Sequence, residues 1–311
     1  LMESLSVFNN SVDKKKSKIN LIKSRETFKK DDFMDAFQNK LKNILENNLK
    51  SDSYYKIKSG IFKGDLELEG LDFLKDTIDP NLRKKRDSIN LERDIKKQKK
   101  FANYVKEELN SLYSSLIHEK DSKFNVLKKL NRYKYEIVDM SYLGNELCYI
   151  ISFQPISNET YHGTLYVNSK DYSVMRFDYK NLKPLFKIKL FGIGVNIFKN
   201  EGRMIFSKNN YGYSLRYLYQ DSSTRFSFNR PLKFIEKNKN VKGRRKQNEI
   251  SMDFELVSLN NSIKEVRVLR DSVINDNDFN KIEESSNILP QYLDEFKTNF
   301  WEEYKEEKDF K

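Results

Sequence analysis

The fold is decided by two apolar runs that a short polar turn joins, YHGTLYVNSKDYSVMRFDY at residues 161–179. Apolar and polar side chains alternate through both runs, and this period of two is typical of half-buried β-strands. The turn at residues 168–171 holds Asn, Ser and Asp, which bond to nearby backbone and tolerate the backbone angles of tight turns. The stretch therefore predicts an antiparallel hairpin.

Further strands with equally short turns lie on both sides of this hairpin. On its N-terminal side, residues 136–142 lead through Gly144 and Asn145 into residues 147–153. On its C-terminal side, alternating or apolar runs predict strands at residues 211–219, 225–235 and 250–259. Sequential strands with no helices between them pair antiparallel, so residues 133–259 predict one antiparallel sheet.

Helical periodicity occurs outside the strand region. Residues 31–49 predict an amphipathic helix, and helical spacing returns from Asp87 to about Leu130. The apolar stripe of the second segment favours packing on a sheet or a helix over a coiled-coil seam, because its heptads do not persist. The acidic tail, residues 276–311, is predicted to be partly helical. The stripe consists of Phe101, Val105, Leu109, Leu112, Tyr113 and Leu116.

The composition is that of a folded but strongly charged protein. Of 311 residues, 38% are hydrophobic, 33% are charged and 13% are aromatic, which provides enough apolar surface for a large core. This excludes collagen-like, linker-like and wholly disordered chains. The formal net charge is +12. Alanine occurs only at Ala36 and Ala102 while Lys and Asn abound, so A/T-rich codon usage explains part of that charge.

Cysteine usage and hydropathy bound the compartment only loosely. Cys148 is alone, which excludes an intrachain disulfide and a cysteine zinc cluster, and it is predicted to be a small buried hydrophobe. The most apolar stretch, residues 185–198, contains two lysines and is shorter than the roughly 20 apolar residues of a membrane span. No charged-then-apolar leader follows Leu1, so we expect a cytoplasmic protein or a mature or trimmed fragment.

Signatures of catalysis are missing from the sequence. It contains neither the Gly-x-Ser-x-Gly elbow of hydrolases nor a phosphate-binding Gly-x-x-x-x-Gly-Lys loop. His118 lacks the second histidine of a zinc-binding helix, and His162 lies within a predicted strand. We therefore predict no catalytic residue, no metal site and no cofactor, and a protein that is not an enzyme.

Clusters of basic residues leave a nucleic-acid-binding function open. Residues 83–86 and 93–100 are rich in cations, and residues 237–246 carry six cations and no acid. Arg244 and Arg245 are the candidate anion-binding residues, for nucleic-acid phosphates or an anionic lipid surface. Solvated loops in a lysine-rich chain are the alternative interpretation. Aromatic residues do not interleave with these cations, which disfavours single-strand binding.

Alternating tyrosines form the most specific local pattern. With a period of two, all five aromatic and apolar side chains of the segment are predicted to share one face of a strand. They form either a core face against the long helix or the lining of an apolar groove, because tyrosine combines an apolar body with a polar tip. The candidate ligand-binding residues are Tyr211, Tyr213, Leu215, Tyr217 and Tyr219.

At residues 19–25, 135–139, 144–155, 161–179 and 300–304, the sequence resembles an envelope family of Bacteroidota, the carboxypeptidase-like regulatory-domain proteins. YEIVD at residues 135–139 with GNELCYIISFQP at residues 144–155 resembles the central hairpin of that family, and residues 161–179 resemble the hairpin that follows it. INLIKSR at residues 19–25 is similar to an early strand and turn. Tyr292 and FWEEY at residues 300–304 look like the closing segment.

This resemblance implies a fold and a compartment but no activity. It implies an α+β fold resembling lipoprotein carriers, in which helices pack on the concave face of a curved antiparallel sheet, a half-barrel. The expected domains are a half-barrel over residues 1–275, with a helical insertion at about 80–130, and the tail 276–311. The family's usual signal peptide and N-terminal β-sandwich are absent from this sequence, which suggests a fragment, and the implied location is the periplasm or outer membrane.

The leading functional interpretation is a non-enzymatic envelope module. Its expected partner is an apolar ligand or an envelope protein, with an anionic lipid surface as a further option and no specific nucleic acid. The alternative is a basic nucleic-acid-binding protein, which a contiguous basic surface with exposed aromatic residues would favour. An enzyme, which a cleft with a buried cluster of titratable groups would favour, ranks last.

Overall fold

The structure is a computed structural model, and it describes most of the strand region but not every segment. Arg244, Arg245 and the basic clusters at residues 83–86 and 93–100 lie outside the described residues, as does most of the predicted helix 31–49, whose seven described positions are all helical. The described residues are 2–10, 16–27, 36, 39–40, 43–44, 47–48, 54–60, 62–67, 101–237, 246–284 and 291–293.

The chain forms two compact units, each built from separate stretches of sequence. The first contains Leu1–Glu108, Arg230–Phe254 and Asp276–Lys311. The second contains Leu109–Asn229 and Glu255–Asn275. The long strands β11 (Gly212–Lys237) and β12 (Lys246–Arg267) contribute residues to both units. Each unit is described by itself below.

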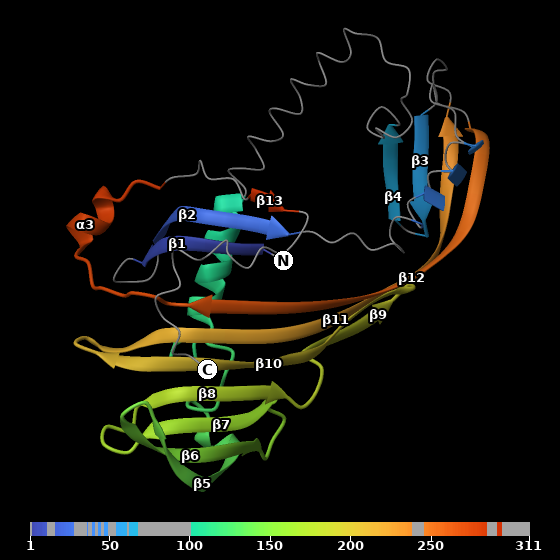
Figure 1. Cartoon of the computed structure of the whole chain (residues 1–311). Helices are drawn as coiled ribbons and strands as arrows, with labels where there is room; N and C mark the ends of the chain where they lie inside the picture. Colours follow the sequence, from blue (N-terminus) through green and yellow to red (C-terminus); the bar gives the residue numbers. More distant parts are fainter. Residues whose placement is uncertain are drawn as a thin grey trace. The chain divides into compact units, whose positions relative to one another are not determined.

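The second unit is an antiparallel sheet in which strands that follow one another mostly pair (Figure 1). The order is β5, β6, β7, β8, β10, β11, β12, and β9 pairs with the first part of β10. All strand pairs with an assigned register from β5 to β11 are antiparallel, which confirms the predicted pairing for this region. The strands are β5 (Tyr133–Leu143), β6 (Glu146–Pro155), β7 (Tyr161–Asn168), β8 (Val174–Asn181), β9 (Phe186–Leu190) and β10 (Ile193–Asn209).

The turn residues act as the sequence predicts. In the β7–β8 turn, the Asn168 side chain accepts the backbone N–H of Lys170 at 2.8 Å, and the Asn168 carbonyl accepts that of Tyr172 at 3.0 Å. In the β5–β6 turn, Gly144 has φ 61°, a left-handed angle that glycine adopts without strain. Local side-chain chemistry therefore fixes two of the hairpins.

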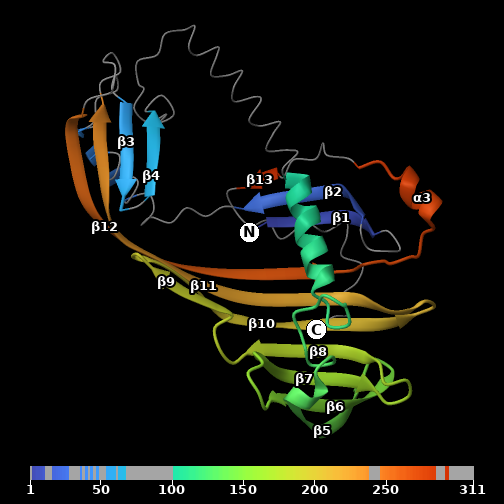
Figure 2. The same ribbon diagram turned by 180° about the vertical axis from the view of Figure 1, so that it is seen from behind.

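One face of this sheet, which we call the inner face, is covered by residues 109–132. Figure 2 shows the segment in front of strands β6 to β8. Phe124 lies at the centre of the contact, with its ring centroid 4.9 Å from that of Phe177 and 4.5 Å from that of Tyr179. The core includes, row by row across the strands, Leu165, Phe177, Met204 and Leu218, together with Leu112, Leu116, Ile117, Phe124 and Val126 from the covering segment.

The long helix is shorter than its periodicity predicts. It covers residues 101–114 of the described chain, and turns and the short 3₁₀-helix Leu130–Arg132 follow it. Ser122 explains part of the ending, because its hydroxyl donates to the Ser115 carbonyl and accepts the N–H of Phe124. Such side-chain bonds compete with helical backbone bonds. The prediction of helix up to Leu130 is therefore wrong, although the stripe residues Val105 and Leu112 are buried as predicted.

The first unit contains two small groups of strands. In the first, β1 (Met2–Asn10) pairs antiparallel with β2 (Ser17–Thr27), and β13 (Gln291–Leu293) pairs parallel with β2. In the second, β3 (Tyr54–Ser59) pairs with β4 (Phe62–Glu67) and with the end of β11.

The tail of the chain is tied to β2 by polar contacts. The helix α3 (Asp276–Lys281) lies in the tail predicted to be partly helical. Lys18 donates from Nζ to the carbonyls of Phe279, Asn280 and Ile282 at 2.9, 3.1 and 2.7 Å. Carbonyls at the end of a helix lack partners within it, so a cation stabilises them.

Candidate functional site

A β-bulge at Arg216 divides the predicted tyrosine stripe between two faces. Phe206 pairs with Leu215, but Ile205, one residue earlier, pairs with Tyr217, so Arg216 is an extra residue on β11. An extra residue on one strand reverses the faces of all the residues beyond it. The prediction that the five side chains share one face is therefore wrong.

The residues before the bulge belong to the inner face or to the turn. Leu215 is in the core, and Tyr213 packs against that core. Tyr211 lies in the β10–β11 turn and is 73% exposed. After the bulge, Leu218 takes the inner position, while Tyr217 and Tyr219 point to the opposite face, which we call the outer face.

Tyr217 and Tyr219 line an open depression on the outer face, which we call the outer hollow. Its volume is about 480 Å³. Two rows of outward side chains border it across the strands: Asp178, Arg203 and Tyr219 in one, Lys180 and Glu201 in the other. Its lining residues are Gly163, Asp178, Tyr179, Lys180, Glu201, Gly202, Arg203, Tyr217 and Tyr219.

Two glycines lie in the row of residues between the two bordering rows. Gly163 on β7 and Gly202 on β10 both lie opposite Tyr179, whose ring packs into the inner core. A Cβ on Gly202 would lie 2.3 Å from the carbonyl oxygen of Tyr219 and 2.7 Å from the hydroxyl of Tyr179. Neither Gly163 nor Gly202 could therefore carry a side chain unless the neighbouring strands moved apart.

The charged side chains of the outer hollow are paired with one another. Arg203 donates from Nε to Asp178 at 2.8 Å, and Arg176 beside it donates from Nε to both Asp178 oxygens at 3.1 and 3.0 Å. Lys180 lies 3.4 Å from Glu201. Paired charges hold each other in a fixed geometry, so the hollow presents oriented donors and acceptors beside two tyrosine rings.

Sequence reasoning found the two tyrosines of this site and missed its charges. The signal was present on one strand, because Arg176, Asp178 and Lys180 alternate with buried Phe177 and Tyr179. The sequence held no such signal for Glu201 and Arg203, because only the pairing of β10 with β8 determines which side chains lie next to them.

Lys123 forms a second polar feature, on the inner side of the same unit. Its ammonium lies over three buried rings, 5.1 Å from the centroid of Phe124, 5.8 Å from Tyr161 and 5.9 Å from Tyr179, and donates to the Asn200 side chain at 3.2 Å. Most of its stem is exposed, but the ammonium end is partly buried. Burial, helped by repulsion from Lys264, lowers the pKa of Lys123 from 10.5 to about 8.

Replacing Lys123 by methionine is expected to stabilise the protein by about 1 kcal/mol at pH 7. The pKa shift of Lys123 alone would suggest a larger gain in the free energy of unfolding, but solvent around the lysine stem screens the charge. Because the pKa of Lys123 is lowered in the folded state, the charged ammonium destabilises the fold to its full extent below pH 8. This destabilisation disappears as the pH rises to about 10.5. Urea unfolding at pH 7 and pH 10.5 measures this.

The matched control for this experiment is Lys134→Met, which removes an exposed cation from β5. The difference between Lys123→Met and wild type should shrink toward zero at the higher pH, whereas the control should show no such trend. An equal difference at both pH values would contradict the assignment of the effect to the charge.

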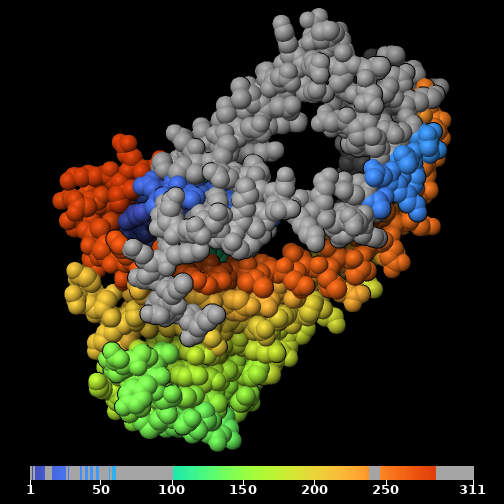
Figure 3. Space-filling view, in the orientation of Figure 1, coloured from blue at the N-terminus to red at the C-terminus, as the bar shows by residue number. Residues whose placement is uncertain are grey.

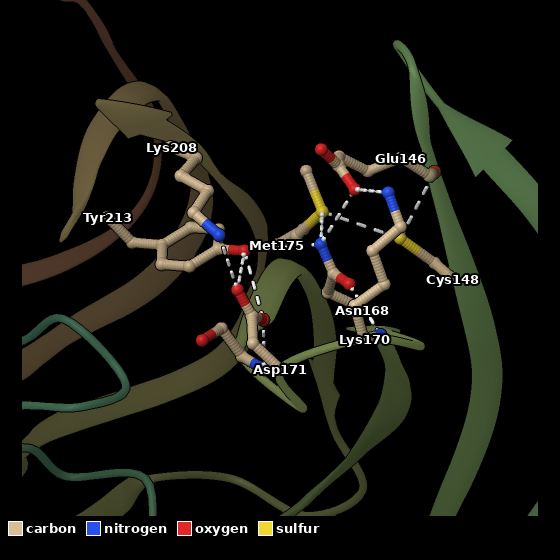
Figure 4. A network of polar contacts seen from close by, with 9 residues as sticks. Glu146, Cys148, Asn168, Lys170, Asp171, Met175, Lys208 and Tyr213 are labelled. Atoms are coloured by element: carbon tan, nitrogen blue, oxygen red, sulfur yellow. Dashed lines mark hydrogen bonds and ion pairs between the residues drawn. The ribbon is translucent and has the colours of Figure 1, made fainter. Parts of the chain in front are cut away.

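The β7–β8 turn carries a third polar cluster, shown in Figure 4. Lys208 and Tyr213 both donate to Asp171, each at 2.9 Å, and the Lys208 contact is the main cause that lowers the pKa of Asp171 to about 2. Nearby, the Cys148 thiol is fully buried 3.5 Å from the Met175 sulfur, and burial raises its pKa. The prediction that Cys148 is a buried hydrophobe is confirmed, and the cluster fixes the turn.

The histidines lie apart from any metal-type cluster. His118 stacks edge-on against Phe206 with centroids 5.2 Å apart, and His162 lies on β7, where burial and then Lys180 lower its pKa. Within the described ranges no group of three or more His, Cys, Asp or Glu side chains is placed to hold a metal ion. No helix in the described part of the chain is long and apolar enough to cross a membrane.

Comparison with known proteins returns no relative. No protein-family model, no curated protein and no solved structure matches the chain significantly.

Proposed function

We propose that this chain is a non-enzymatic binding module that holds a protein partner in the outer hollow. One observation carries the proposal: two half-buried tyrosines and two ion pairs surround an open hollow on the face of the sheet that the chain's own core does not use. Tyrosine and arginine are the residues that contribute most to binding at protein interfaces.

A protein partner suits this site better than an apolar molecule. The inner face, where an apolar groove was predicted, is occupied by residues 109–132 of the chain itself. The outer hollow instead combines aromatic rings with the charges of Asp178 and Arg203. A small apolar ligand would leave those charges without water, whereas a polypeptide can supply hydrogen bonds to them.

The absence of enzymatic activity remains part of the proposal. In the outer hollow each carboxylate already accepts from a neighbouring cation, Asp178 from Arg203 and Glu201 from Lys180 or from Lys199 at 3.1 Å. A general acid or base needs instead a carboxyl group free to exchange its proton with a substrate. Ion-paired carboxylates of this kind favour recognition over proton transfer.

The cellular location of the protein and the curvature of its sheet are also proposals. We infer a periplasmic or outer-membrane location and a half-barrel with helices on its concave face from the resemblance of residues 135–155 and 161–179 to the envelope family. The two segments form consecutive hairpins, β5–β6 and β7–β8, as that resemblance expects. Residues 109–132, which pack on the inner face, would be the covering layer, with helix at residues 109–114 and mainly turns beyond them.

The protein-binding proposal can be tested with a pool of random peptides displayed on phage. Peptides selected on the wild-type chain are expected to bind the double variant Tyr217→Ala, Tyr219→Ala at least about tenfold more weakly, since each tyrosine at such a site contributes about 1–2 kcal/mol. The matched control is Tyr142→Ala, Tyr172→Ala, which removes two exposed tyrosines from β5 and from the β7–β8 turn.

Two outcomes would contradict the proposal. Selected peptides that bind both double variants equally would show that the outer hollow is not the binding site. A fluorescent fatty acid that binds the wild type and is lost from the first variant would instead favour an apolar ligand. Circular dichroism of each variant checks that the sheet is intact.

A further inference from the structure

The hairpin of β9 and the start of β10 carries an apolar face that the described residues leave largely open. Register places Phe186, Ile188 and Leu190 of β9 beside Ile197, Val195 and Ile193 of β10, so one face of the hairpin consists of six apolar side chains. The three β10 residues are half-buried, and the three of β9 are 47–56% exposed. Figure 3 shows this region, in yellow-green, at the surface.

Cations occupy the other face of the same hairpin. Lys187 and Lys189 of β9 lie opposite Asn196 and Gly194 of β10. The stem of Lys189 lies across Gly194, because a Cβ on that glycine would be 3.7 Å from the Lys189 Cγ. The hairpin is thus amphipathic, with apolar and cationic residues strictly alternating along β9.

The tip of the hairpin is apolar and held in place. It is formed by Phe191, which is 61% exposed and has the left-handed φ of 48°, and by Gly192. The Gly192 carbonyl accepts the backbone N–H of Asn229 on β11 at 2.8 Å. Phe191 thus extends the exposed apolar face of β9 to the tip, and a contiguous exposed apolar patch is typical of an interaction surface.

We infer that the β9–β10 tip inserts into the surface of an anionic lipid bilayer, a role separate from the outer hollow. Strand geometry places Lys189 about 7 Å and Lys187 about 13 Å behind Phe191. The headgroup layer of a bilayer is about 5–8 Å thick. When Phe191 reaches the acyl boundary, Lys189 is therefore at headgroup depth, and both flexible lysine stems can extend toward anionic headgroups.

Charge favours a bilayer over a protein as the occupant. The whole chain carries +12, so it is drawn to an anionic surface before the tip makes contact. A protein partner would need a matching apolar cleft with acids at its rim. A bilayer of anionic lipid offers both properties at any point of its surface, and the hairpin requires nothing more specific than these.

The test uses the full chain and vesicles of phosphatidylcholine with or without roughly one-third phosphatidylglycerol. The variant Phe191→Asn removes the apolar tip and suits left-handed backbone, so the fold should be kept. Its partitioning onto anionic vesicles is expected to fall about tenfold. The double variant Lys187→Gln, Lys189→Gln should fall about tenfold on anionic vesicles and not on neutral ones.

The matched control is Tyr172→Asn, because Tyr172 is likewise an exposed aromatic residue with left-handed backbone, at φ 59° in the β7–β8 turn. Its partitioning should stay within about twofold of the wild type. Equal losses for Tyr172→Asn and Phe191→Asn would overturn the inference, as would wild-type protein that stays in solution. A wild type that does not bind vesicles, but that self-associates or binds peptides in a way that Phe191→Asn abolishes, would also overturn the inference. That result would assign the tip to a protein partner.

Discussion

Replacing Phe177 by alanine is expected to lower the free energy of unfolding by about 3–5 kcal/mol. Phe177 is fully buried at the centre of the inner face. Its ring stacks with Phe153 and Tyr179, at centroid distances of 5.7 and 5.3 Å, and meets Phe124 edge-on at 4.9 Å. Alanine would leave a cavity bordered by the rings of Phe153 on β6, Tyr179 on β8 and Phe124 in the covering segment, which cannot all move inward. Urea unfolding followed by near-ultraviolet circular dichroism measures the change.

The control for this prediction is Phe186→Ala, which truncates the same side chain on β9, where it is 48% exposed. That change should cost about 1 kcal/mol or less, because little apolar surface leaves the core. Similar losses for the two variants would mean that residues 109–132 do not pack on the inner face as described.

A second large effect is expected for Gly163→Ala, about 3 kcal/mol or more, from backbone crowding instead of a cavity. Gly163 pairs with Tyr179, and a Cβ at this position would lie 2.0 Å from the carbonyl oxygen of Asp178. Backbone cannot rotate away as a side chain can, so β7 and β8 would have to separate. Because Asp178 is part of the outer hollow, the variant should also lose peptide binding. Thermal unfolding and the phage-selected peptides report the two effects.

Gly144→Ala separates crowding from backbone strain. Gly163 has a positive φ, of 157°, and Gly144 has one of 61°, but nothing lies within 4 Å of the Gly144 Cβ position in the β5–β6 turn. Its replacement should cost about 1 kcal/mol, the ordinary cost of alanine with such an angle. If Gly163→Ala were no worse than Gly144→Ala, the close approach of β7 to β8 would be disproved.

The hairpins were predictable from sequence because their signals are local. Residues 161–179 contain both the period of two and the turn residues that set the pairing, so neighbouring side chains suffice to identify β7 and β8. The end of the long helix at residue 114 was not predictable from its stripe. The apolar spacing continues to Leu116, while a single hydroxyl, that of Ser122, supplies bonds that compete with further helix.

The candidate site was predictable only in part because bulges leave little trace in the sequence. Tyr217 and Tyr219 were selected as members of an inner stripe, yet they line the outer hollow because Arg216 is an extra residue. Arginine is not a residue that marks a bulge, and register is set by the partner strand β10. The charges of Glu201 and Arg203 meet Lys180 and Asp178 only through that same pairing.

The bulge at Arg216 also bears on how such a protein changes over evolutionary time. Substitutions alter one side chain at a time, whereas loss of the one codon for residue 216 would remove the bulge and leave Leu215 opposite Phe206 and Tyr217 opposite Ile205. Every other residue of β11 would keep its partner on β10 and therefore its face. A bulge therefore lets a long strand take up a single inserted codon while the residues on both sides keep their places in core and solvent.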